Sequence, residues 1–143
     1  MNFKDIHIGT LINHAVTDSG IEISRICNFF KCTPADVYVM FESKTIDTEI
    51  LLKWSKLLEY DFFRIYTQHM ILYAPPSADN PATNSGLPKF RKNIYTKEII
   101  EFILEQLESG EMTRKQVIER YRIPKTTLYK WISKYKDLVD TGI

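Results

Sequence analysis

A proline-rich segment divides this chain of 143 residues into two short parts. Four of the six prolines fall within residues 74–88, where Leu87 is the one large apolar side chain. Such a segment buries too little surface to offset the entropy lost on ordering, and its prolines favour an extended linker. Each flanking part must therefore build a hydrophobic core of its own.

Both parts show apolar residues at helical spacing, separated by short polar breaks, and neither shows the alternation of a strand. The sequence therefore predicts an all-α fold with two small helical domains joined by the proline-rich linker. The predicted division is a five-helix domain at 1–73, a linker and basic arm at 74–93, a three-helix domain at 94–137 and a tail at 138–143.

Composition excludes several classes of protein. The chain is 44% hydrophobic and 26% charged, which is ordinary for a soluble domain. No apolar run approaches the length of a membrane span, and the first residues lack the basic and apolar regions of a signal peptide, so we expect a cytoplasmic protein without a membrane partner. Cys27 and Cys32 are too few for a disulfide framework, and we interpret both as small apolar fillers.

Charge is distributed unevenly along the chain. The net charge is +1, but residues 1–73 hold 7 Lys and Arg against 9 Asp and Glu, whereas residues 89–143 hold 12 against 8. This asymmetry indicates that the C-terminal part meets a polyanion.

The N-terminal part predicts five helices. The first spans about 6–17, the second follows Ile23 with Ser24 as its N-cap, and the third runs from the cap Thr33 to about Glu42. The fourth spans about 47–59, and Asp61 caps the fifth.

A tight turn at residues 31–33 joins the second and third of these helices. With the small Cys27 before it and the apolar Val37 after it, the pair predicts a helix-turn-helix. In order and spacing, residues 6–73 resemble the lambda-repressor-like (XRE-type) family, which implies DNA binding by the third helix.

The outward residues of that third helix include two acids and no base, which is weak electrostatics for phosphate contact. Two readings therefore stay open: Thr33 and Tyr38 contact DNA, or this unit serves dimerisation or protein binding. The aromatic residues of the fourth and fifth helices favour a core that continues into a homodimer interface. They are Trp54, Tyr60, Phe62, Phe63, Tyr66 and Tyr73.

The C-terminal part predicts three helices after a basic arm that contains Lys89, Arg91 and Lys92. Thr96 caps the first, which ends at Gly110. A capping box of Thr113 and Gln116 starts the second, which ends at a turn containing Arg122 and Ile123. The last begins at Pro124 or Lys125 and runs to about Tyr135.

Residues 96–136 resemble the helix-turn-helix of insertion-element transposases and of related Psq-like and resolvase-like domains. The residues that carry the resemblance are Val117, Tyr121, Ile123, Pro124, Thr126, Thr127, Leu128, Tyr129, Trp131 and Tyr135. The resemblance implies that the last helix recognises DNA.

The spacing of the last helix supports that implication, because Leu128 and Trp131 must face the core. The outward face then consists of Lys125, Thr126, Thr127, Tyr129, Lys130, Ser133 and Lys134. We expect Thr126, Thr127 and Tyr129 to contact bases. The residues expected to hold phosphates are Lys125, Lys130, Lys134, Arg114 and Lys115.

Catalytic patterns are missing from the sequence. A transposase needs several carboxylates on an α/β domain, yet only Asp137 and Asp140 follow residue 136. No phosphate-binding glycine loop, nucleophile with a base, or metal-ligand cluster is recognisable. We therefore expect no enzyme, cofactor or metal.

The predicted function is sequence-specific binding of double-stranded DNA as a transcriptional regulator. The alternatives are a non-catalytic subunit of a transposase or mobile element, and a protein-interaction adaptor that uses the N-terminal domain.

Overall fold

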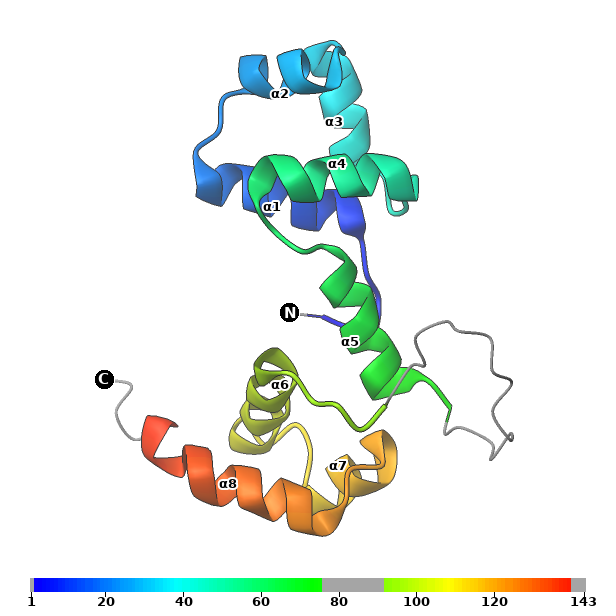
Figure 1. Cartoon of the computed structure of the whole chain (residues 1–143). Helices are drawn as coiled ribbons and strands as arrows, with labels where there is room; N and C mark the ends of the chain where they lie inside the picture. Colours follow the sequence, from blue (N-terminus) through cyan, green and yellow to red (C-terminus); the bar gives the residue numbers. More distant parts are fainter. Residues whose placement is uncertain (1, 76–91, 140–143) are drawn as a thin grey trace. The chain divides into compact units, whose positions relative to one another are not determined.

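The computed structural model describes residues 2–75 and 92–139, except for the side chains of 136–139. These residues form eight helices and no strand, which confirms the all-α fold (Figure 1). None of these helices combines the length and the apolar character needed to cross a membrane. The helices are α1 (Ile8–Ser19), α2 (Ile23–Phe30), α3 (Pro34–Glu42), α4 (Thr48–Leu58), α5 (Phe63–Tyr73), α6 (Lys97–Glu108), α7 (Arg114–Tyr121) and α8 (Lys125–Val139).

The chain divides into two compact units, and the division falls inside α5. The N-terminal unit comprises residues 2–67, and the C-terminal unit begins at Gln68. The boundary thus precedes the predicted linker, of which residues 76–91 lie outside the described residues.

The N-terminal unit packs α1, α3 and α4 around one core, with α2 against α3. Its most buried side chains are Ile8, Ile12, Val16, Ile26, Val37, Phe41, Leu51, Trp54, Phe62 and Ile65. The start of α1 lies directly against the end of α3, where the Gly9 backbone N–H donates to the Ser43 carbonyl at 3.0 Å. A Cβ at Gly9 would meet the carbonyl oxygens of Met40 and Phe41 at 2.4 Å, so this close approach requires glycine.

Side-chain caps explain most helix starts in this unit. Thr33 caps α3 with Pro34 in its first turn, as the sequence predicts. Asp47 caps α4, a role that the sequence analysis did not assign to it. The prediction that Ser24 caps α2 is wrong. The Glu22 carbonyl already accepts from the N–H of Arg25 at 3.1 Å, so the first turn begins at Ile23 and contains Ser24.

The turn between α2 and α3 brings the two cysteines together. Lys31 adopts a left-handed conformation with φ 55°, and the Cys32 N–H donates to the Cys27 carbonyl at 3.1 Å. This is the backbone pattern of a Schellman motif, in which the two flanking side chains touch. Both thiols are unoxidised and half-buried. Burial is the main cause that raises the pKa of Cys32, and the proximity of Cys27 adds to it.

The C-terminal unit contains α6, α7, α8 and the end of α5 (Figure 1). Its buried apolar side chains are Ile71, Leu72, Ile99, Ile103, Val117, Tyr121, Ile123, Leu128 and Trp131. Thr96 caps α6 as the sequence predicts, and α8 continues four residues beyond the predicted end at Tyr135.

Polar contacts also tie the end of α5 to the other helices of the C-terminal unit. Buried Gln68 donates from Nε2 to the Thr96 hydroxyl at 3.4 Å. The ring of Tyr73 lies 6.0 Å from that of Tyr121, whose hydroxyl donates to Gln106 Oε1 at 3.0 Å. The last residues of α5 are therefore part of this unit's core.

Candidate nucleic-acid interface

Helices α7 and α8 form a helix-turn-helix. The predicted capping box at the start of α7 is confirmed, since Gln116 N–H donates to the Thr113 hydroxyl at 3.3 Å and Thr113 N–H donates to Gln116 Oε1 at 2.8 Å. Arg122 ends α7 in a left-handed conformation with φ 54°, and Ile123 fills the turn at 1% exposure. The Leu128 N–H then donates to the Pro124 carbonyl, which starts α8.

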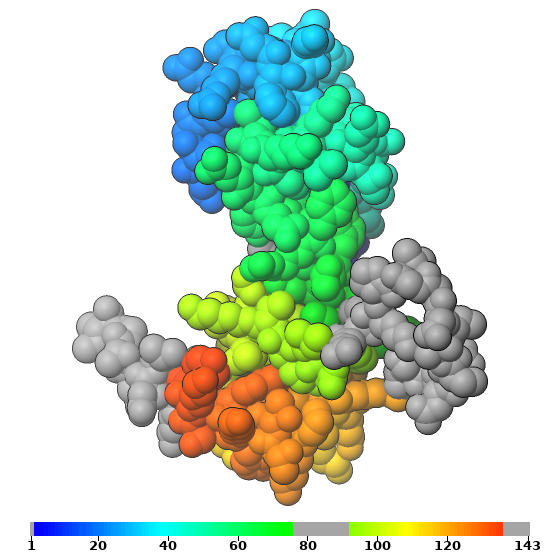
Figure 2. Space-filling model, in the orientation of Figure 1, coloured from blue at the N-terminus to red at the C-terminus, as the bar shows by residue number. Residues whose placement is uncertain are grey.

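The two sides of α8 differ in chemistry. Leu128 is fully buried and Trp131 is 7% exposed, with its ring edge-on to Tyr95 at 4.9 Å. The opposite side presents Lys125, Thr126, Tyr129, Lys130, Ser133 and Lys134 as exposed residues, and Thr127 as a half-buried one. In the space-filling view α7 and α8 form one continuous surface (Figure 2).

This helix-turn-helix is strongly basic. Residues 113–135 hold seven Lys and Arg residues and one acid, Glu119. The four acids of α6 at positions 98, 101, 105 and 108 are all exposed and share one stripe of that helix. Acids are thus concentrated on α6 and cations on the two-helix motif of the C-terminal unit.

Tyr129 lies at the centre of the basic surface. The Arg114 guanidinium carbon, from the first turn of α7, lies 5.1 Å from the centroid of the Tyr129 ring. The Lys125 ammonium, from the first turn of α8, lies 5.6 Å from the same centroid. Both distances are in the range of cation–π attraction. The ring of Tyr129 therefore connects the starts of both helices of the motif.

The predicted basic arm is only partly within the described residues. Lys89 and Arg91 lie outside them. Lys92 is half-buried, and its ammonium donates to the Ala74 carbonyl just after the end of α5. Burial, and then the charge of Arg122, lowers the pKa of Lys92. Lys92 thus holds the end of α5, whereas Arg114 and Lys115 of α7 are exposed.

Sequence reasoning missed Arg122 as a candidate contact residue. Its exposed side chain projects from the turn between α7 and α8, next to the basic surface. The signal that could have identified it is its positive charge, together with its predicted position in the turn between the two helices.

The N-terminal helix-turn-helix presents a different surface. The Thr33 hydroxyl accepts from the Asp36 N–H at 3.3 Å and donates to the Asp36 carboxylate at 2.9 Å. Hydrogen bonds from Thr33 also lower the pKa of Asp36. Tyr38 is 56% exposed and Val39 is 65% exposed on the outward side of α3. The hydroxyl of Thr33 is thus committed to the cap, and Tyr38 belongs to a surface that is apolar and acidic.

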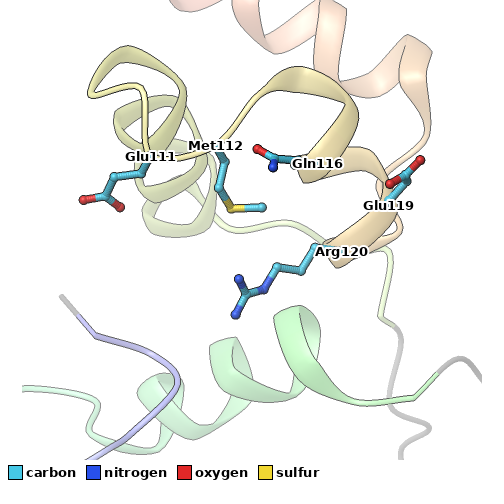
Figure 3. Close-up of a pocket in the computed structure, with 5 residues that line it drawn as sticks. All are labelled: Glu111, Met112, Gln116, Glu119 and Arg120. Carbon is cyan, nitrogen blue, oxygen red and sulfur yellow. The ribbon is translucent and has the colours of Figure 1, made fainter.

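A surface pocket of about 420 Å³ adjoins α7. Glu111 and Met112 line it from the turn after α6, and Gln116, Glu119 and Arg120 line it from α7 (Figure 3). The two carboxylates lie at opposite ends of the pocket and point away from each other (Figure 3). Among the described residues, no three His, Cys, Asp or Glu side chains are grouped as metal ligands.

Comparison of the chain with protein-family models, with curated proteins and with solved structures finds no match.

Proposed function

We propose that this protein binds double-stranded DNA in a sequence-dependent way through α7 and α8, and that it acts as a transcriptional regulator. The observation that carries the proposal is the outward side of α8, which combines three lysines with hydroxyl groups and has no carboxylate over residues 125–135. That side belongs to the second helix of a helix-turn-helix, and its residues are exposed except for the half-buried Thr127. An α-helix of this kind fits the major groove of B-DNA.

The exposed residues divide by chemistry into two roles. Thr126, Lys130 and Ser133 lie on one stripe of α8 and have the donors and acceptors that read base edges, which moves Lys130 from the phosphate role that the sequence predicts to a base. Thr127, predicted to contact a base, is half-buried and takes no part in this proposal. Lys134 on α8 and Lys115 on α7 are exposed and supply charge to phosphates, which fixes the register of the protein on the duplex. The acidic stripe of α6 repels phosphate, so it favours an approach of DNA to the α7–α8 side.

A salt-titrated binding assay on the full chain tests the proposal. We expect binding to random duplex at low salt, with log K falling linearly with log salt by about 0.9 per phosphate contact. Lys134→Gln should weaken binding to all sequences and reduce the slope by about one contact. Lys53→Gln, an exposed change in α4, is the matched control and should leave both unchanged.

Selection of bound sites from a random duplex pool tests sequence dependence. An enriched motif supports a regulator, and a pool without enrichment contradicts it. A DNA-binding subunit of a mobile element would use the same surface. The two functions differ in where the selected motif occurs, at promoters or at the ends of a mobile element.

A second function is favoured by the outward side of α3. Its exposed Tyr38 and Val39 are large and apolar, and the helix carries Asp36 and Glu42 but no cation. Such a surface suits a protein partner better than phosphate. In this variant of the proposal the C-terminal unit contacts DNA and the N-terminal unit acts as an adaptor for a protein.

A further inference from the structure

We infer that Tyr129 is a positioning residue that holds Arg114 and Lys125 together on one backbone phosphate of the bound duplex. The inference rests on the proposed DNA binding and deepens it. It also changes the role that the sequence predicts for Tyr129, from contact with a base to organisation of two cations.

Two cations from different helices lie close to one aromatic ring. Arg114 and Lys125 come from different helices, yet both lie within 6 Å of the centre of one ring. Both side chains are positively charged, and among the described residues neither forms an ion pair with a carboxylate. The ring supplies an attraction that keeps each cation close to it.

A pair of cations of this kind can bind a phosphate. A phosphate carries the negative charge that attracts both cations, and its oxygens accept from a guanidinium and an ammonium at once. The site is open to such a group, because Arg114, Lys125 and Tyr129 are all exposed. The side chains are already collected before binding, so little of their rotamer freedom remains to be lost.

The ring of Tyr129 is itself occupied by these cations. A base that stacks on an aromatic side chain needs an open ring face. Tyr129 is 41% exposed, but two cations lie over its ring. The two cations therefore hinder stacking of a base on this ring, and we expect Thr126, Lys130 and Ser133, on the same side of α8, to contact the base edges.

Tyr129→Phe and Tyr129→Leu in the full chain separate these roles. We expect Tyr129→Phe to bind duplex within about twofold of the unmodified chain, because the ring is kept. Tyr129→Leu should bind roughly 5- to 30-fold more weakly, which is the size that two exposed cation–π contacts supply. It should also show a shallower salt dependence, while the motif selected from a random pool stays the same.

A double-mutant cycle gives a readout that a merely structural residue would not move. Arg114→Gln should weaken binding more in the unmodified chain than in Tyr129→Leu, because without the ring Arg114 is no longer held in place. Competition with inorganic phosphate distinguishes a site for a phosphate group of the duplex from a site for the free ion. We expect millimolar phosphate to displace duplex no better than chloride at equal ionic strength.

Three results would overturn the inference while leaving the proposed function intact. One is a change of the selected motif in Tyr129→Leu, which would make Tyr129 a base-contacting residue. Another is a loss in Tyr129→Phe as large as in Tyr129→Leu, which would assign the contact to the hydroxyl. The third is additivity of Arg114→Gln and Tyr129→Leu. Failure of the unmodified chain to bind duplex at low salt would instead remove the proposed function itself.

Discussion

Gly9 shows how a single residue fixes the packing of the N-terminal unit. The missing side chain lets α1 approach three backbone carbonyls at the end of α3, and the Ile8 N–H donates to the Lys44 carbonyl at 3.2 Å beside it. Backbone oxygens at 2.4–2.6 Å from a new Cβ cannot move aside without shifting a helix. A methyl group at this position must therefore separate the two helices.

We expect Gly9→Ala to destabilise the N-terminal unit by about 3 kcal/mol, the upper part of the range for overpacked cores. Gly20→Ala is the comparison, because Gly20 has a left-handed φ of 68° but no neighbour within 4 Å of a new Cβ. Its cost should be about 1 kcal/mol. Denaturant unfolding of both variants measures the difference, and a smaller cost for Gly9→Ala would contradict the steric argument.

Trp131 is the residue on α8 whose role is structural. It is 7% exposed, lies on the same side as Leu128 and contacts the ring of Tyr95. We expect Trp131→Ala to cost about 3–5 kcal/mol and to unfold the C-terminal unit, as loss of a large buried side chain does. Circular dichroism follows the helices of both units, and the fluorescence of Trp54 follows the N-terminal unit alone. A variant that stays folded but loses DNA binding would instead assign Trp131 to the interface.

Residue roles that depend on helical spacing could be predicted from the sequence, and those that depend on long-range contacts could not. Leu128, Trp131 and Ile123 are buried because their positions along the chain already determine which side they occupy. Lys92 is separated by eighteen residues from its partner Ala74, and Arg114 by fifteen from Tyr129. No local pattern connects the two residues of either pair. The sequence analysis therefore assigned Lys92, Arg114 and Tyr129 to DNA and did not identify their contacts within the protein.

At the scale of elements, helix starts were predictable where a threonine side chain makes the cap. Thr33, Thr96 and Thr113 each accept a backbone N–H three residues ahead. The cap of α1 by His7, which accepts from the Thr10 N–H, was missed, because histidine is not a common N-cap residue. The start of α2 was missed as well, because Glu22 provides only its backbone carbonyl and no side-chain cap. The double role of α5 was also missed. Its periodic pattern is continuous, and only tertiary contacts distinguish the residues up to Thr67 from those that begin at Gln68.

The contact of α5 with α7 predicts an alkaline sensitivity of the C-terminal unit. Burial raises the pKa of Tyr73 to about 12, and the adjacent Tyr121 contributes to the shift. The unfolded chain then loses this proton near pH 10, before the folded chain does, so stability falls as pH rises from about 10 to 12. Tyr73→Phe should flatten this fall in a pH series of thermal unfolding.

Thr67→Ala, an exposed change one residue before the C-terminal unit, serves as the control for that series and should keep the alkaline fall. Burial also raises the pKa values of Tyr66 and Tyr95, so a residual slope is expected in Tyr73→Phe. An unchanged slope in Tyr73→Phe would show that the contact between α5 and α7 does not control the titration.

At the scale of the whole molecule, the position of the unit boundary determines which pieces of the chain fold. A fragment of residues 68–143 keeps Ile71 and Leu72 in the core, whereas a fragment of residues 92–143 lacks both. Burial of two such side chains stabilises by about 3–6 kcal/mol, a large part of what a domain this small can have. We expect cooperative thermal unfolding by circular dichroism for the longer fragment only. Equal transitions would contradict the role of α5.

The exposed aromatic residues of the N-terminal unit predict a homodimer of the full chain. Tyr60 is 43% exposed, and Phe63 and Tyr66 are each 36% exposed, on a unit whose core is already complete. One helix-turn-helix reads only a few base pairs, and each mismatch is worth about 1–3 kcal/mol, so two copies would supply the discrimination that one lacks. The full chain is the proper sample, since a cut at residue 73 would expose the end of α5.

Sedimentation of the full chain at micromolar concentration measures this association. We expect a dimer, and we expect Phe63→Ser to shift it toward monomer, because an isologous interface loses the same side chain twice.

Val39→Ser on α3 is the matched control and should leave the dimer intact, because Val39 is also an apolar residue and is more exposed than Phe63. If Val39→Ser dissociates the dimer and Phe63→Ser does not, the two copies meet through α3. A monomer at all concentrations, with one chain bound per DNA site, would leave DNA recognition to a single copy and would favour the adaptor role for the exposed residues of α3.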